Sequence, residues 1–225
     1  NVNEVIELPP TWANTFPHVY TGLFLLAWGM FESFVKASLK EVLNKIVDER
    51  GSVDKLPKPF RKRWEEYALK MLNNPNFGPF RPYTSQGGGS GAPVSPQVVS
   101  LAGQLHSYYR RDNALQLDCD VALVTESNMD PRLILELFRL VEVDNLWDNI
   151  RAQTYVQSYF QQTSVSKGDI TSKLEDIKAL RNQFAHPVEE SSSLSADSVK
   201  EYLEFILVLS QAMDEQCSVL LNARR

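Results

Sequence analysis

Residues 19–49 read VYTGLFLLAWGMFESFVKASLKEVLNKIVDE. In the second half of this stretch, apolar residues recur at helical spacing while charged residues occupy the other side. The apolar set is Phe31, Phe34, Val35, Leu39, Val42, Leu43 and Ile46. The first half is almost continuously apolar, which indicates a helix that is buried on most of its sides. The stretch therefore predicts one long helix over residues 19–49.

The apolar run at residues 19–31 is too short to predict a membrane span. It ends at Glu32, well before the roughly 20 apolar residues that a spanning helix requires. The residues before it include Glu4 and Glu7 and lack the basic region of a secretory signal. The sequence therefore predicts no contact with a membrane.

Prolines separate the remaining apolar-periodic runs instead of interrupting them, as is typical of a helical protein. Further helices are predicted over residues 60–72, 96–111, 131–140 and 144–162, from Asp169 or Thr171 to His186, and over 195–222. Asp130 is the predicted N-cap of the helix that begins with Pro131. Residues 115–123 alternate apolar and polar side chains, which fits a short extended piece or a loop. The pattern predicts an all-α bundle with a long first helix and a long C-terminal helix.

Length and composition limit the class of protein. The chain has 225 residues and a formal net charge of −5, with 43% hydrophobic and 23% charged residues, so it is predicted to form a single domain over residues 1–225. Residues 74–96 are predicted to be a flexible loop, and residues 87–91 (GGGSG) are typical of an engineered linker. An acidic chain is not a bulk nucleic-acid binder, so any such binding requires a local basic patch.

Cysteine and histidine usage argues against a disulfide framework and a metal centre. The two cysteines, Cys119 and Cys217, indicate a reducing compartment and hence a cytoplasmic protein. The three histidines are scattered and no cysteine pair accompanies them, so no metal ion and no other cofactor is predicted.

Residues 174–187, LEDIKALRNQFAHP, contain the residues most suited to chemistry. On a helical wheel, Leu174, Ile177, Leu180 and Phe184 form an apolar stripe, and Arg181 falls about 40° from its middle. A charge in that position must be paired or must face a cleft, because an unpaired buried charge is costly.

His186 lies five residues after Arg181, and Pro187 predicts that the helix ends there. A helix C-terminus favours the protonated imidazole, so this segment offers a fixed cation beside a group that titrates near neutral pH. These are the groups that cleave RNA without a metal ion: one deprotonates the ribose 2′-OH, one protonates the leaving oxygen, and a cation stabilises the phosphorane. The alternative is that His186 only caps the helix.

Three segments resemble the HEPN superfamily. The motif Arg181-Asn182-x-x-Ala185-His186-Pro187 is similar to its signature, in which a polar residue follows Arg and four positions separate Arg from His, although Pro187 stands where the related branch often has Gly. Residues 25–36 (LLAWGMFESFVK) resemble its first-helix pattern. Residues 126–129 (ESNM) resemble the Ser-Asn-Leu element of the branch that is often joined to a RiboL-PSP domain.

The resemblance implies an α-helical homodimer in which two Arg/His pairs meet in one cleft and act as a metal-independent endoribonuclease, as in toxins and defence nucleases. Arg181 and His186 would be the catalytic pair, Asn182 the supporting polar residue, and Glu32 a residue that orients Arg181. The implied partners are RNA as substrate and an antitoxin or other regulatory protein. The alternative function is a catalytically silent HEPN module that dimerises and binds a partner protein or nucleotide.

Residues 55–70 form a local basic segment with interleaved aromatic residues. Lys58, Arg61 and Lys62 are the predicted RNA-binding residues, because cations beside aromatic rings can hold phosphates and stack bases. A solvated amphipathic helix is the alternative interpretation of this segment.

Overall fold

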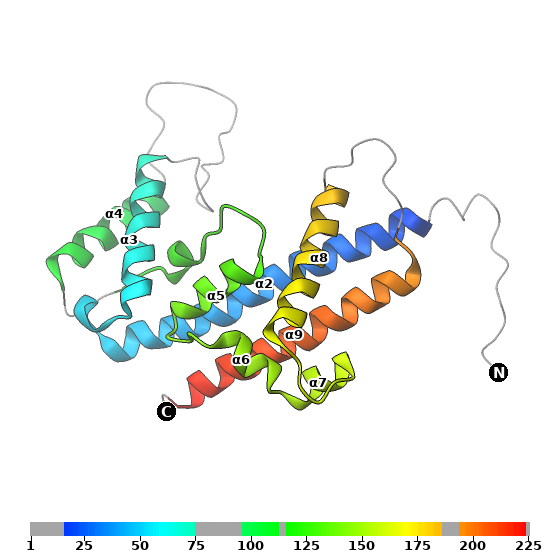
Figure 1. Ribbon diagram of the computed structural model, residues 1–225. Helices are drawn as coiled ribbons and strands as arrows, with labels where there is room; N and C mark the ends of the chain where they lie inside the picture. Colours follow the sequence, from blue (N-terminus) through cyan, green and yellow to red (C-terminus); the bar gives the residue numbers. More distant parts are fainter. Residues whose placement is uncertain (1–15, 75–95, 113–115, 186–193, 224–225) are drawn as a thin grey trace, which may run out of the picture. The chain divides into compact units, whose positions relative to one another are not determined.

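The computed structural model describes residues 16–74, 96–112, 116–185 and 194–223. These residues form helices and connecting turns and include no strand, which confirms the predicted all-α class. The α-helices, labelled as in Figure 1, are α2 (Phe16–Arg50), α3 (Lys58–Asn73), α4 (Pro96–Arg110), α5 (Pro131–Arg139), α6 (Leu146–Arg151), α7 (Thr154–Phe160), α8 (Lys167–Ala185) and α9 (Ala196–Asn222). Two short 3₁₀ helices are η1 (Val53–Lys55) and η2 (Cys119–Leu123).

The chain divides into two compact units. Unit 1 comprises residues 1–35 and 147–216, and unit 2 comprises residues 36–146 and 217–225. The long helices α2 and α9 therefore each contribute residues to both units. The prediction of a single domain over residues 1–225 stays a prediction.

The core of unit 1 forms where α8 and α9 lie against the first part of α2 (Figure 1). Phe24 of α2 is fully buried, and its ring centroid lies 6.4 Å from that of Phe184 and 5.7 Å from that of Tyr202. Phe205 of α9 packs against the rings of Tyr159 and Phe160 at the end of α7. Aromatic side chains from all four helices thus hold unit 1 together.

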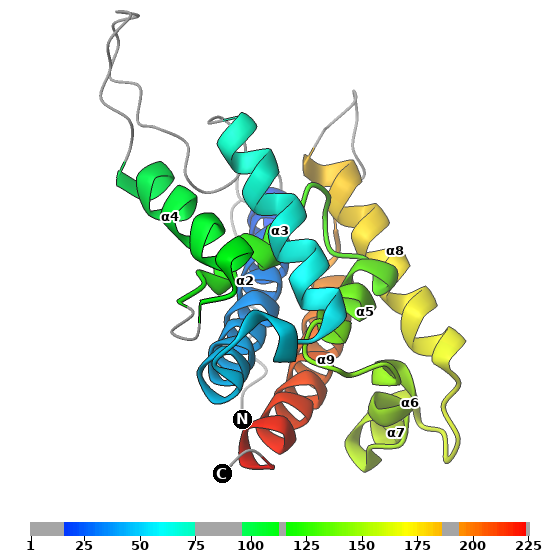
Figure 2. The ribbon, with the colours of Figure 1, turned by 90° about the vertical axis from the view of Figure 1, so that its left-hand side faces the viewer.

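The core of unit 2 forms around α3, with α4 beside it (Figure 2). Trp64 is fully buried and stacks on Tyr108 of α4 at a centroid distance of 5.2 Å. The unit also buries the second part of α2, from Leu39 to Val47, on one face. Helix α2 ends at Arg50 because Gly51 takes a left-handed conformation with φ of 63° and donates its N–H to the Val47 carbonyl at 3.0 Å.

Helix α2 is long and apolar enough to cross a membrane, by length and composition alone. The segment that meets both criteria extends from His18 to Arg50, and its most apolar stretch has a mean hydropathy of 1.3. A core helix is equally apolar, and Phe24, Trp28 and Phe31 are buried within the protein. The hydropathy of α2 is therefore weak support for a membrane span. Only 28% of the apolar stretch is buried, however, so the prediction that its first half is buried on most of its sides is wrong: one face is exposed.

The possible strand at residues 115–123 is wrong where the structure describes it, because Cys119–Leu123 forms the 3₁₀ helix η2. The Asp118 carboxylate accepts a hydrogen bond from the Asp120 N–H at 3.0 Å, which bends the backbone into the first turn of the 3₁₀ helix. Val121, Ala122 and Leu123 are buried in succession, which a half-exposed strand could not achieve. Leu115, also part of that prediction, lies outside the described residues.

The prediction of a single helix over residues 144–162 is wrong, because the segment forms two separate helices, α6 and α7. The chain is extended at Gln153, where ψ is 134°. In one continuous helix, Val156 would point roughly 130° away from the face formed by Leu146, Trp147 and Ile150. The interruption turns α7 so that all four side chains are buried.

Candidate active site

Helix α8 lies in unit 1 and carries Arg181 and Asn182 of the Arg–x4–His motif. It begins with a reciprocal capping arrangement in which Ser166 N–H donates to the Asp169 carboxylate and Asp169 N–H donates to the Ser166 hydroxyl, at 2.8 and 3.1 Å. It thus starts two residues before the earliest predicted position. Leu174, Ile177 and Phe184 are buried, as predicted, while Leu180 is half-buried.

Arg181 lies beside this buried stripe and is itself half-buried. One polar contact of its guanidinium is a long hydrogen bond of 3.5 Å from Nη1 to the Asn182 Oδ1. Among the described residues, no carboxylate lies within ion-pair distance of the guanidinium. Water only partly solvates Arg181 at this half-buried position.

Asn182 is half-buried, and its side-chain oxygen accepts from Arg181. His186 follows Ala185, the last residue of α8, but lies outside the described residues. The structure therefore brings Arg181 and Asn182 together, while the position of the His186 side chain stays a prediction.

Glu32 lies half-buried on α2, where its carboxylate accepts a hydrogen bond from Trp28 Nε1 at 2.9 Å. No ion pair joins it to Arg181 within the described ranges. Its role in orienting Arg181 stays a prediction. The Trp28–Glu32 contact has the i, i+4 spacing of a helix, a signal that the sequence contained and that the prediction overlooked.

Lys173, two turns before Arg181, is a residue that sequence reasoning missed. Its ammonium pairs with the Glu201 carboxylate of α9 and lies 5.5 Å from the ring centroid of Tyr202. The side chain is only 20% exposed, and although burial acts to lower it, the pKa of Lys173 is raised by the partners of the ammonium. This contact fixes α8 against α9 and so holds the helix that carries Arg181.

The predicted RNA-binding residues lie in unit 2, on α3. Lys58 and Lys62 are exposed, whereas Arg61 is half-buried and its guanidinium lies 3.8 Å from the Asp54 carboxylate. Arg63, which was not selected from the sequence, donates to the Ala122 and Val124 carbonyl oxygens at 2.7 and 2.9 Å. The α3 cations thus differ in availability, and their role in RNA binding stays a prediction.

The loop that follows η2 contains the third family-like element, residues 126–129. The Glu126 carboxylate accepts from the Lys70 ammonium at 2.9 Å and from the Tyr67 hydroxyl at 3.1 Å. The hydrogen bond from Lys70, and to a smaller extent that from Tyr67, lowers the pKa of Glu126 below its usual value. Asp130 then caps α5 by accepting from the Leu133 N–H at 2.7 Å, as predicted.

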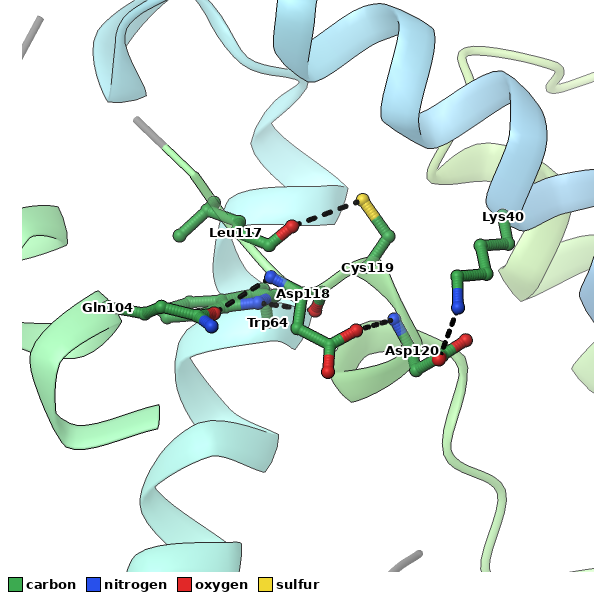
Figure 3. A network of polar contacts seen from close by, with 7 residues as sticks. All are labelled: Lys40, Trp64, Gln104, Leu117, Asp118, Cys119 and Asp120. Carbon is green, nitrogen blue, oxygen red and sulfur yellow. Dashed lines mark hydrogen bonds and ion pairs between the residues drawn. The ribbon is translucent and has the colours of Figure 1, made fainter. Parts of the chain in front are cut away.

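A polar network at the start of η2 connects residues 118–120 to the helices α2, α3 and α4 (Figure 3). The Lys40 ammonium lies 2.5 Å from the Asp120 carboxylate, Trp64 Nε1 donates to the Asp118 carbonyl at 3.0 Å, and Gln104 accepts from the Asp118 N–H at 2.8 Å. Cys119 sits inside this network, and burial raises the pKa of its thiol to about 12. A thiol that stays protonated at neutral pH is not a nucleophile, so the network is structural.

No cluster of three or more metal-ligating side chains occurs in the part of the chain that the structure describes. The residues of unit 1 that the motif selects for chemistry are Arg181, its amide partner Asn182 and the histidine that follows α8 in the sequence.

A chain whose described residues form helices, with a long first and a long last helix and with Arg181 and Asn182 of the Arg–x4–His motif near the end of α8, has the features of a HEPN protein. The model of the RiboL-PSP-HEPN family matches residues 3–219 of the chain. The protein therefore belongs to the RiboL-PSP-HEPN family. Neither a curated protein nor a solved structure matches it.

Proposed function

We propose that this HEPN protein is a metal-independent endoribonuclease. The observation that carries the proposal is Arg181, which is half-buried, has no carboxylate partner among the described residues and is hydrogen-bonded to Asn182. A guanidinium whose charge is not neutralised can stabilise an anion, and its donors match the oxygens of a phosphate. Membership of the RiboL-PSP-HEPN family supports the same assignment.

In the proposed reaction the ribose 2′-oxygen attacks the adjacent phosphorus and the bond to the 5′-oxygen breaks. His186 removes the proton from the 2′-OH, and the same residue of a second copy gives a proton to the leaving 5′-oxygen. Arg181 stabilises the charge of the phosphorane, and Asn182 orients the Arg181 guanidinium. The products are one RNA end with a 2′,3′-cyclic phosphate and one with a 5′-hydroxyl.

The proposed site requires two copies of the chain, because one copy has a single histidine in the motif and the reaction needs both a base and an acid. An exposed apolar stripe on α2 supports this requirement. Val19, Leu23, Leu26 and Met30 are 46%, 48%, 61% and 64% exposed. Their spacing of four, three and four residues is the heptad pattern by which helices pair. We propose that this stripe contacts a second copy of the chain.

The decisive experiment incubates the purified protein with single-stranded and structured RNA in the presence of EDTA. We expect cleavage that persists in EDTA and leaves 2′,3′-cyclic phosphate ends, and we expect no cleavage by the His186→Ala variant. Cleavage that survives His186→Ala would refute the catalytic assignment. Intact RNA after incubation with the wild-type protein would instead favour a silent HEPN module.

A further inference from the structure

A shallow groove of about 280 Å³ lies between α3 and α5 in unit 2. Its charged lining consists of Lys62, Arg63 and Glu66 of α3 and Glu136 and Arg139 of α5. Three cations and two carboxylates share this small surface, so the partners of each group determine which charge a ligand would meet.

Both carboxylates of the groove are already paired with cations. Glu66 lies 3.0 Å from the ammonium of Lys70, and Glu136 lies 3.1 Å from the guanidinium of Arg132, each one helical turn away. These two cations are not among the residues that line the groove. Both pairs are exposed, so they offset the negative charge of the groove only in part, and the three cations of its lining still outnumber the two carboxylates.

The cations of the groove are less compensated. Lys62 is exposed and forms no ion pair with any described residue. The hydrogen-bond acceptors of Arg63 are the Ala122 and Val124 carbonyls, which fix its guanidinium without cancelling its charge. Arg139 lies 3.6 Å from Asp144, but both side chains are well exposed, which weakens that pair. The groove thus presents net positive charge, part of it held rigidly.

We propose that this groove binds a backbone phosphate of the RNA substrate through Lys62, Arg63 and Arg139. The proposal rests on the proposed ribonuclease function and identifies where the substrate is held in unit 2. It differs from the sequence prediction, since Arg63 and Arg139 line the groove whereas Lys58 and Arg61 do not. A guanidinium held by two carbonyls loses little conformational freedom when it binds an anion.

We take a phosphate of a polynucleotide as the ligand because the groove is open and small. Its volume of about 280 Å³ is at the lower end of the roughly 300–1,000 Å³ of pockets that enclose a small-molecule ligand. A phosphate fits such a volume. The flanking residues of an RNA chain would simply continue across the surface of α3.

The test measures the affinity of the full chain for a fluorescein-labelled single-stranded RNA at a series of KCl concentrations, by fluorescence anisotropy. All proteins carry His186→Ala so that the RNA stays intact. The test variant adds Lys62→Ala and Arg139→Ala, and Arg63 is left in place because it supports η2. The matched control adds Lys200→Ala and Arg110→Ala, which remove two equally charged side chains that are 76% and 68% exposed.

We expect the test variant to bind RNA roughly tenfold more weakly at low salt. The slope of log affinity against log salt concentration should also fall, by up to about 0.7, since the groove holds one phosphate and each phosphate contact on a single strand contributes about 0.7. The control should bind like the parent protein. Equal binding by test variant and control would overturn the proposal, and so would a parent protein that does not bind RNA.

Competition with AMP separates the two possible sources of the phosphate. RNA that stays bound in excess AMP supports a polynucleotide site, whereas displacement by AMP would make the groove a nucleotide site and overturn the proposal. The outcome is independent of cleavage. A protein that binds RNA through the groove but never cuts it would refute only the ribonuclease, and one that cuts RNA without using the groove would refute only this inference.

Discussion

Arg181 is a half-buried cation, and a charge in such a position lowers the stability of the fold unless it is paired with a partner or an anion. Replacing it with alanine removes the fixed cation that stabilises the phosphorane, so we expect Arg181→Ala to lower kcat by on the order of 10²–10³, or about 3–4 kcal/mol. Single-turnover rates on a labelled RNA measure this loss. Lys178→Ala is the control, because it removes a cation one turn earlier on α8. Equal rates for Arg181→Ala and Lys178→Ala would contradict the role of Arg181.

The candidate site could be predicted in part at the scale of single residues. The helical wheel correctly anticipated that Arg181 would lie beside the buried stripe of α8. The prediction overlooked the hydrogen bond from Trp28 to Glu32, although the i, i+4 spacing of the two residues was present in the sequence. The helical wheel could not separate Arg61 from Arg63, since their partners Asp54 and the Ala122 carbonyl depend on how the chain folds back onto α3.

The exposed apolar stripe of α2 allows dimerisation to be tested on a single helix. Leu26→Lys combined with Met30→Lys places two charges on the face that we expect to contact a second copy, so the variant should be a monomer that no longer cleaves RNA. Both side chains are more than half exposed in the single chain, so the helical content of the variant should be unchanged. Light scattering measures the mass, and circular dichroism measures the helicity.

Leu207→Lys provides the matched control, because Leu207 is 68% exposed on α9 and lies outside the stripe. We expect this variant to remain a dimer and to cleave RNA at the wild-type rate. A double lysine variant of α2 that stays dimeric would show that the copies meet elsewhere.

Most helices could be predicted at this scale because each has a strong local signal. Helix α5 has a capping aspartate followed by proline, and α2 has a continuous apolar periodicity that ends at Gly51. The segments that were wrong have signals that tertiary packing overrides. At η2 the Asp118 carboxylate bends a sequence of alternating apolar and polar residues into a 3₁₀ helix. Between α6 and α7 the burial of Val156 interrupts a helix that local preference would continue.

At the scale of the whole molecule, the stability of unit 1 depends on contacts between distant parts of the chain. Phe24→Ala removes a fully buried ring that contacts Phe184 and Tyr202, so we expect the free energy of unfolding to fall by about 3–5 kcal/mol. Urea denaturation followed by circular dichroism measures this change. Leu207→Ala should alter the free energy of unfolding by less than about 0.5 kcal/mol, because its side chain is exposed. A similar loss in both variants would contradict this description of the core.

The division of the chain into two units has a consequence for its synthesis on the ribosome. Unit 1 needs residues up to 216 and unit 2 needs residues from 217 onward, so neither unit is complete until the ribosome has translated its late segment. Phe24 leaves the exit tunnel long before Phe184 and Tyr202, and its ring lacks these two partners in the meantime. A nascent chain that has not yet reached Gln216 therefore lacks the complete scaffold that holds Arg181.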